Sequence, residues 1–220
     1  MGKQTGYIRN GLVLWLDGVN RGGIAGQWID RIDGNVCTFI GDCVELENGV
    51  RFGAGAENTQ YGAFDKLVQI SKDVGTIEWV IQLNSVSSTG RPVLSMGNLM
   101  MGGSIASDTA GLYCPAMRYY GGTNNSMDFY RFRDVDSRSV LIYTMSGSSE
   151  RAMCNGTLAE RLTVTSWPNR QTGRLASRGE GNPFKGVIYA VRLYNRHLTE
   201  AEMLHNQRLD NKRYNLGLTI

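Results

Sequence analysis

Hydrophobic and polar residues alternate along many short segments of this chain, which is the pattern of β-strands with one buried face. The clearest segment is Gly75–Leu83. Its apolar face consists of Ile77, Trp79, Ile81 and Leu83. Segment 11–17 is apolar on both faces, so we expect a buried strand with Trp15 inside. Further predicted strands are 37–40, 43–46, 93–96, 112–117, 127–133 and 139–145.

The last predicted strand is Val187–Tyr194. Strict alternation places four apolar side chains on one face, namely Val187, Tyr189, Val191 and Leu193. Arg192 falls on the opposite face, where we expect it to stay near water. This strand is therefore predicted to have one buried and one solvated face.

A short capped helix is predicted after this strand. Thr199 and Glu202 have the spacing of a capping box, in which each side chain accepts the other's backbone N–H. Leu198 and Met203 are placed for a hydrophobic staple. We expect the helix to cover about 199–210 and to fade towards Arg213, where basic side chains suit the negative end of the helix dipole.

Turn residues fit a meandering antiparallel sheet in a single domain. The chain has 28 glycines and only 4 prolines, so tight turns are many and rigid breaks are few. Asn48-Gly49 and Asn155-Gly156 are hairpin signals, since both residue types tolerate positive φ. All-β sandwiches commonly reach ~200–250 residues as one domain. We therefore predict one domain over the 220 residues.

Several of these segments, in this order, resemble the laminin-G-like jelly-roll group of concanavalin A-like β-sandwiches. The matching features are the Leu14-Trp-Leu-Asp17 strand with its Gly-rich loop, Trp28 with the turn at 30–35, the Asn48-Gly49 turn before Phe52, the Trp79 strand, the Asn155-Gly156 hairpin and the closing strand and helix. The resemblance implies an all-β, two-sheet antiparallel jelly-roll sandwich with a short C-terminal helix. The strand core would cover about 11–194 of a single domain 1–220.

Charge and hydropathy argue against two classes of partner. Lys and Arg number 23 against 20 Asp and Glu, and a net charge of +3 gives no electrostatic case for nucleic acid. No segment approaches the ~18 apolar residues of a membrane helix, so we predict no membrane partner. Arg is commoner than Lys, which is typical of protein interfaces.

Cysteine and histidine spacing does not indicate zinc. The four cysteines are Cys37, Cys43, Cys114 and Cys154, without a Cys-x-x-Cys pair. His197 and His205 are distant in sequence, so we interpret the cysteines as buried small residues. A Cys37–Cys43 bridge across a hairpin stays open.

The carboxylates do not form the pattern of a glycoside hydrolase. Retaining enzymes of this fold class pair two carboxylates on one strand face, one as acid and one as nucleophile. Glu45 and Glu47 border a turn, and Glu78 stands alone on the face opposite Trp79, where we interpret it as a surface residue. We therefore predict that the chain is not an enzyme.

Calcium is the commonest cofactor that the resemblance implies, with ligands from loop carboxylates at one edge of the sandwich. The loop acids that would supply them are Asp17, Asp30, Asp33 and Asp108. Turn aspartates more often bond their own backbone, so we predict no cofactor and keep calcium as the alternative.

Aromatic and amide side chains mark two candidate glycan sites. Segment 118–125 contains Tyr119, Tyr120, Asn124 and Asn125, and Trp167 belongs to a second site. Sugars stack on such rings and bond such amides. The two tyrosines could instead cover an edge of the core or form part of a protein interface, and we rank these two interpretations above a glycan site.

The resemblance extends to laminin-G-like proteins among bacteriophage structural genes. No apolar signal region precedes the first strand, and a virion protein needs none because lysis releases it. We therefore predict a non-enzymatic virion protein for capsid decoration, a head fibre or a tail, which docks other virion proteins or itself, with glycan binding as an optional addition. The alternative is a secreted or cell-surface carbohydrate-binding module that uses calcium, and a glycosidase is a third option.

Overall fold

The structure is a computed structural model of the 220-residue chain. It describes residues 6–53, 60–70, 74–83, 94–96, 99–101, 118–121, 125–128, 138–146, 149–162, 170–177 and 184–220. Predicted strand 112–117, and the part of 127–133 beyond residue 128, lie outside the described residues. Within the described part, no helix is long and apolar enough to cross a membrane.

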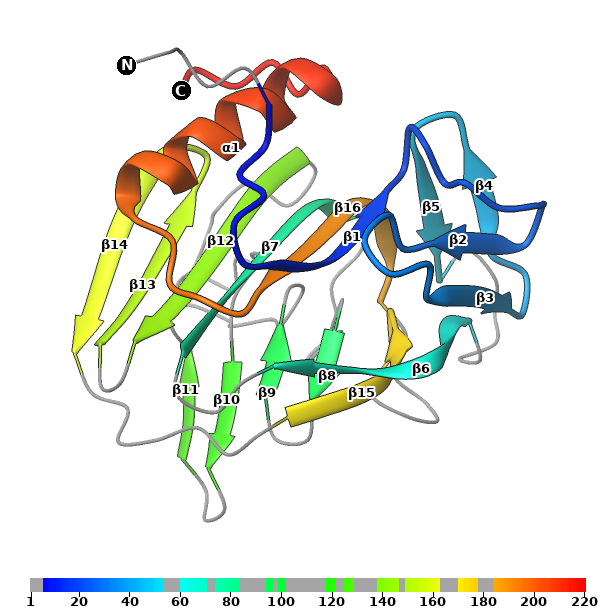
Figure 1. The fold of residues 1–220 in the computed structure, drawn as a ribbon, viewed down its shortest axis with the longest axis horizontal. Coiled ribbons are helices and arrows are strands. Elements are labelled where there is room, and N and C mark those ends of the chain that lie inside the picture. The colour runs from blue at the N-terminus through cyan, green and yellow to red at the C-terminus, as the bar shows by residue number, and fades with distance from the viewer. Residues whose placement is uncertain are drawn as a thin grey trace, which may run out of the picture.

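Two antiparallel sheets face each other in a sandwich, which confirms the predicted fold class (Figure 1). The first sheet has the order β14-β13-β12-β7-β16-β5-β4, and β1 also pairs with β16. Its strands are β1 (Leu12–Asp17), β4 (Val44–Leu46), β5 (Gly49–Phe52), β7 (Val74–Leu83), β12 (Arg138–Ser146), β13 (Ser149–Cys154), β14 (Thr157–Leu162) and β16 (Gly186–Tyr194).

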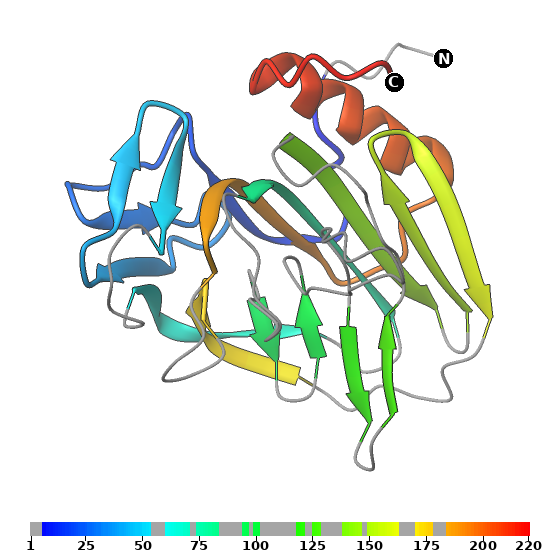
Figure 2. The same ribbon diagram turned by 180° about the vertical axis from the view of Figure 1, so that it is seen from behind.

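The second sheet has the order β11-β10-β9-β8-β15-β6-β3-β2. Figure 2 shows both sheets from behind, with β8 to β11 (green) below the long strands of the first sheet in this view. Its strands are β2 (Gln27–Ile29), β3 (Val36–Ile40), β6 (Tyr61–Ile70), β8 (Leu94–Met96), β9 (Leu99–Met101), β10 (Arg118–Gly121), β11 (Asn125–Asp128) and β15 (Arg170–Leu175).

The main hydrophobic core lies between the two sheets. Its side chains come from the inward-facing positions of the strands and include Leu14, Leu16, Trp28, Phe52, Ile77, Trp79, Ile81, Leu175, Val191 and Leu193. Ile77, Trp79 and Ile81 therefore share a face as predicted. Trp15 is buried as well, but on the outer face of the first sheet.

Helix α1 (Glu200–Arg213) covers that outer face, and the chain that follows it folds back along the helix (Figure 1). The predicted capping box is confirmed, since Thr199 N donates to Glu202 Oε2 at 2.9 Å and Glu202 N donates to Thr199 Oγ1 at 3.3 Å. Leu198 and Met203 are both fully buried in one cluster with Trp15, as the staple predicts.

The predicted alternation of β16 is wrong in its first half. A β-bulge between Ile188 and Ala190 shifts the register against β7. The extra residue reverses the side-chain alternation, so Val187 and Tyr189 lie on the helix side with Tyr214. Val191 and Leu193 stay in the core between the sheets.

Two charged residues expected near water are buried, which corrects the interpretation of Arg192 and Glu78. Both side chains are 0% exposed and pair with each other. The reason is α1, which covers the outer face of β16 and β7 and adds Asp210 to the pair. Sequence alternation marks this face as polar but cannot show that a helix covers it.

The hairpins follow their turn residues with one difference. Asn155 and Gly156 both have positive φ between β13 and β14, as predicted. At position 49 glycine is required by a close contact and not by a positive φ. A Cβ at this position would lie 2.7 Å from the Ile188 carbonyl oxygen. β3 and β4 do not form a hairpin but belong to different sheets, and Cys37 and Cys43 are free thiols.

Candidate ligand-binding pocket

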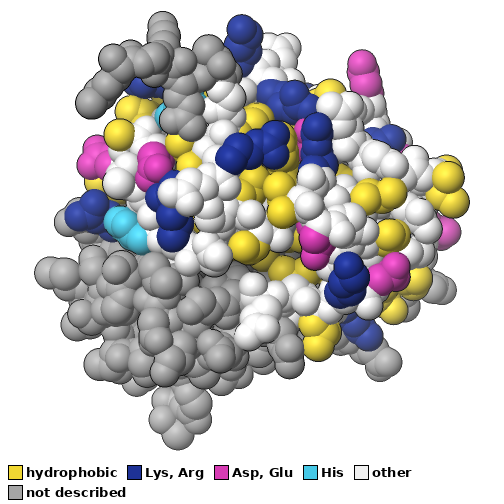
Figure 3. Space-filling view, in the orientation of Figure 1, with side chains coloured by type: hydrophobic (Ala, Val, Ile, Leu, Met, Phe, Trp, Pro, Cys, Tyr) yellow, Lys and Arg dark blue, Asp and Glu magenta, His cyan; other side chains and the backbone are white. Residues whose placement is uncertain are grey.

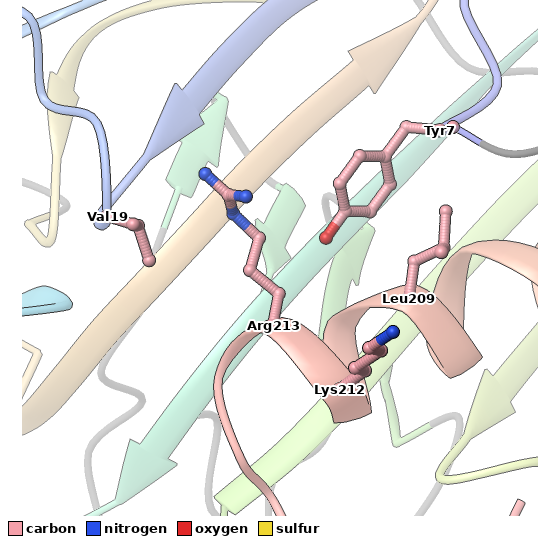
Figure 4. Close-up of a pocket in the computed structure, with 6 residues that line it drawn as sticks. Tyr7, Val19, Leu209, Lys212 and Arg213 are labelled. Carbon is pink, nitrogen blue, oxygen red and sulfur yellow. The ribbon is translucent and has the colours of Figure 1, made fainter.

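A pocket of about 420 Å³ opens where the end of α1 meets the chain on either side of β1 (Figure 4). Its described lining is Gly6, Tyr7, Val19, Leu209, Lys212 and Arg213. Tyr7 precedes β1 and Val19 follows it, whereas the last three residues come from the final turns of α1. Positions 209, 212 and 213 are three and four residues apart, so they share one helix face.

Tyr7 is held from several sides. Its hydroxyl donates to Asp210 Oδ1 at 2.8 Å, and the Arg192 guanidinium carbon lies 4.2 Å from its ring centroid. The edge of Trp15 lies against it at 5.2 Å between centroids. Burial, followed by the charge of Asp210, raises the pKa of Tyr7 well above its ordinary value, so the phenol stays protonated. The ring therefore forms a fixed, neutral wall of the pocket.

Arg213 is held by a buried carboxylate. It donates from Nη2 to Asp17 Oδ2 at 2.6 Å and from Nε to Oδ1 at 3.2 Å. Arg31 Nη1 donates to the same Oδ2 at 2.7 Å, and the Tyr214 hydroxyl donates to Oδ1 at 3.1 Å. Burial raises the pKa of Asp17, but the bonds from Arg213 and Arg31 outweigh it, so the pKa lies below its ordinary value. Asp17 is thus an anion that fixes two guanidinium groups.

A buried ionic network lies beneath the pocket. Arg192 Nε donates to Glu78 Oε2 at 2.9 Å, Arg192 Nη2 also donates to Asp210 Oδ2, and Asn206 Nδ2 donates to Glu78 Oε2 at 3.0 Å. Burial raises the pKa of Asp210 to about 8, more than the charge of Arg192 lowers it. All three charged side chains are 0% exposed, so this network supports α1 and does not face a ligand.

Basic side chains gather around the pocket opening. Figure 3 shows Lys and Arg side chains between the end of α1 and β1, with hydrophobic side chains among them. The guanidinium carbons of Arg9 and Arg31 lie 4.3 Å and 4.6 Å from the Trp15 ring centroid. Arg31 and Arg213 share Asp17, so the arginines form a continuous row beside Lys212.

The structure places three of the four predicted calcium ligands in internal bonds. Asp17 binds Arg31 and Arg213, as described above. Asp30 Oδ1 accepts from Trp15 N at 2.6 Å, and Asp33 Oδ1 accepts from Asn35 N at 2.9 Å. Asp108 lies outside the described residues. In the part of the chain that the structure describes, no three His, Cys, Asp or Glu side chains are grouped to hold a metal. The prediction that the chain has no cofactor, with calcium as the alternative, stays a prediction.

The predicted glycan segment belongs to the second sheet, whereas the pocket lies beside α1 and β1 of the first sheet. Tyr119 and Tyr120 belong to β10 and Asn125 begins β11, where Gly121 pairs with Asn125. This hairpin forms one edge of the second sheet. Asn124 and Trp167 lie outside the described residues, so the role of this segment stays a prediction.

The sequence reasoning did not identify the pocket residues. The sequence indicates only that basic side chains near Arg213 suit the end of a helix, and it does not indicate Tyr7 as a site residue. The helix spacing of Leu209, Lys212 and Arg213 was a signal for one shared face. Nothing in the sequence indicates that Tyr7 meets Asp210, 203 positions away.

Comparison with known proteins identifies the fold but no family. No family model matches the chain, and no curated protein matches its sequence. Trypanosoma rangeli sialidase in complex with sialic acid has a TM-score of 0.60 at 13% identity, over 92% of this chain and 33% of that chain. The chain thus spans about a third of the sialidase.

Two other solved structures are domains of larger proteins. The binding domain of botulinum neurotoxin DC, in complex with rat synaptotagmin II, has a TM-score of 0.61 at 10% identity, over 90% of this chain and 51% of that chain. Domain 4 of AbnA, an extracellular arabinanase from Geobacillus stearothermophilus, in complex with arabinotriose, has a TM-score of 0.57 at 10% identity, over 88% of this chain and 97% of that chain. Such low identities show a shared β-sandwich fold alone.

Proposed function

We propose that this chain is a non-enzymatic binding domain, and that it holds a carbohydrate in the pocket at the end of α1. The observation that supports this most strongly is the pocket lining. It combines the ring of Tyr7 and the apolar Val19 and Leu209 with the basic Lys212 and Arg213. Ligand sites are concave and mostly apolar, with a few polar groups that fix orientation. A sugar offers apolar C–H faces and hydroxyl groups to such a lining.

The chemistry of the lining supports binding without catalysis. Hydrolysis of a glycosidic bond in most families needs two carboxyl groups beside the bond. The described lining contains none. Asp17 and Asp210 approach from below, but their side chains are 0% exposed and are bound by arginines.

The fold neighbours also favour a binding role. Domain 4 of AbnA, which carries arabinotriose, is matched over 97% of its length, so the whole of that domain corresponds to this chain. The neurotoxin binding domain in complex with synaptotagmin II has a similar fold and a protein partner. This sandwich therefore serves as a scaffold for ligands of both kinds, and the pocket chemistry favours the carbohydrate.

A glycan array with the intact protein tests the proposal, followed by calorimetry on the bound glycans. Val19→Asp puts a charge into the pocket lining at a side chain that is 43% exposed, so the fold should tolerate it. We expect it to weaken binding about tenfold or more, which is ~1.4 kcal/mol or more, because the new carboxylate would compete with the ligand for the Arg213 guanidinium beside it. Ile24→Asp is the matched control, in the same loop but outside the described lining. Equal affinities of the two variants, or an array without bound glycans, would reject the proposal.

The virion role stays a prediction from the resemblance. A glycan-binding domain is compatible with a virion surface, with a secreted protein and with a cell surface. Co-sedimentation of the native protein with intact particles through a salt wash separates the first location from the others.

A further inference from the structure

We infer that the pocket selects carbohydrates that carry a carboxylate, such as a uronic acid. This inference rests on the proposed function and specifies its ligand. It follows from the charge around the pocket, the fixed geometry of Arg213 and the position of Lys212.

The charges around the pocket do not balance. Arg9, Arg31 and Arg213 form the continuous row described above, and Lys212 lies in the lining. In the described part of this surface, Asp17 is the carboxylate that faces the row, and its side chain is 0% exposed. The cations keep access to solvent, as the side chains of Arg31 and Arg213 are 34% and 27% exposed. A ligand therefore meets an excess of positive charge.

Arg213 is positioned to donate to a ligand. Its Nε and Nη2 donate to Asp17, which fixes the plane of the guanidinium group. The group points into the space between Val19 and Tyr7 (Figure 4). Nη1 has no partner among the residues that the structure describes, and Arg matches a carboxylate with planar, charge-assisted bonds. Asp17 is thus a positioning residue for Arg213.

Lys212 provides a second, independent cation. It is exposed on the last turn of α1, and within the described residues it forms no ion pair. Arg208 is also exposed on α1, but it does not belong to the described lining. Lys212 and Arg208 therefore both place an exposed positive charge on α1, but of the two only Lys212 belongs to the described pocket lining.

The apolar part of the pocket favours a sugar over a bare anion. Tyr7, Val19 and Leu209 provide surface for a ring, and a volume of about 420 Å³ falls within the ~300–1,000 Å³ of small-molecule sites. A free acetate or phosphate would contact the cations but leave these side chains in water. The ligand that uses the whole lining has an anionic group attached to a ring.

Matched sugars test the inference on the intact protein. Methyl glucuronide and methyl glucoside differ by a carboxylate in place of a hydroxymethyl group, and NMR titration measures both affinities. We expect the glucuronide to bind about 10- to 100-fold more tightly, because charge-assisted hydrogen bonds are stronger than neutral ones. High salt should reduce this preference. Lys212→Met should lose about tenfold in glucuronide affinity, whereas Arg208→Met should keep the wild-type value, with thermal unfolding as the check that both fold.

The outcomes separate the inference from the proposed function. Equal binding of the two sugars, or equal effects of Lys212→Met and Arg208→Met, would overturn the carboxylate preference and leave the carbohydrate function standing. Binding of sodium acetate or sodium phosphate as tight as that of the glucuronide would also overturn it, because the ring would then contribute nothing. If neither sugar binds while the glycan array shows neutral ligands, the inference alone fails. An empty array rejects the proposed function.

Discussion

Arg192 connects α1 to the first sheet through buried ion pairs. Its side chain is 0% exposed and bridges Glu78 of β7 to Asp210 of α1. Replacing it by methionine keeps most of the volume but leaves the buried Glu78 carboxylate without its cation. Removing one partner of a buried ion pair typically costs ~3–5 kcal/mol, because the remaining charge has lost its solvation and its partner. We therefore expect Arg192→Met to lose about 3–5 kcal/mol of the free energy of unfolding.

Two controls isolate the buried charge as the cause. Arg196→Met removes an ion pair with Glu202 whose side chains are 25% and 26% exposed, so it should cost only about 1 kcal/mol or less. The triple replacement Glu78→Leu, Arg192→Met and Asp210→Leu removes all three charged side chains of the network together. It should be more stable than Arg192→Met alone, since exchanging a complete buried network for apolar side chains is often near neutral.

Urea denaturation followed by tryptophan fluorescence is the assay, because Trp15, Trp28 and Trp79 are all buried. The midpoint and slope together give the free energy of unfolding. A typical domain has only ~5–15 kcal/mol in total, so the expected loss is easily measured. An Arg192→Met variant within about 1 kcal/mol of wild type would refute the reasoning.

Two pH predictions concern α1. Hydrogen bonds from Arg196 and then the Thr199 backbone lower the pKa of Glu202 from 4.5 to about 2. The contribution of Glu202 to the free energy of unfolding is therefore complete above a pH of about 4.5 and is lost as the pH falls towards 2. Glu202→Gln should flatten the dependence of stability on pH in that range, and an unchanged acid slope in urea titrations would contradict this. Burial raises the pKa of Asp210 from 3.8 to about 8, so the folded state binds the extra proton and stability falls as the pH rises between these values. Asp210→Asn should therefore flatten the curve between them, and a slope equal to that of wild type would argue against the assignment.

The elements that depend on near neighbours in sequence were predictable. The capping box and staple of α1 need residues three to five positions apart, and the Asn155-Gly156 hairpin needs two adjacent residues with positive φ. The long strand β7 was predicted from alternation alone, because one face enters the core between the sheets.

The features that depend on distant contacts were not predictable. Glu78 and Arg192 each look like solvated residues in their own strands, and only the position of α1 makes them a buried pair. The bulge in β16 depends on its pairing with β7, so strict alternation placed Val187 and Tyr189 on the wrong face. The pocket joins the segment before β1 to the last turns of α1, and no local pattern relates these two parts of the chain.

The most direct test of the account is to map where a carbohydrate binds. NMR amide shifts of the intact protein would be followed while it is titrated with a glycan that the array identifies. We expect saturable shifts grouped at Tyr7, Val19 and residues 209–213, and their loss in Val19→Asp but not in Ile24→Asp. Shifts confined to the second sheet, for example along β6 and β15 or at the hairpin of β10 and β11, would contradict the placement of the site at α1.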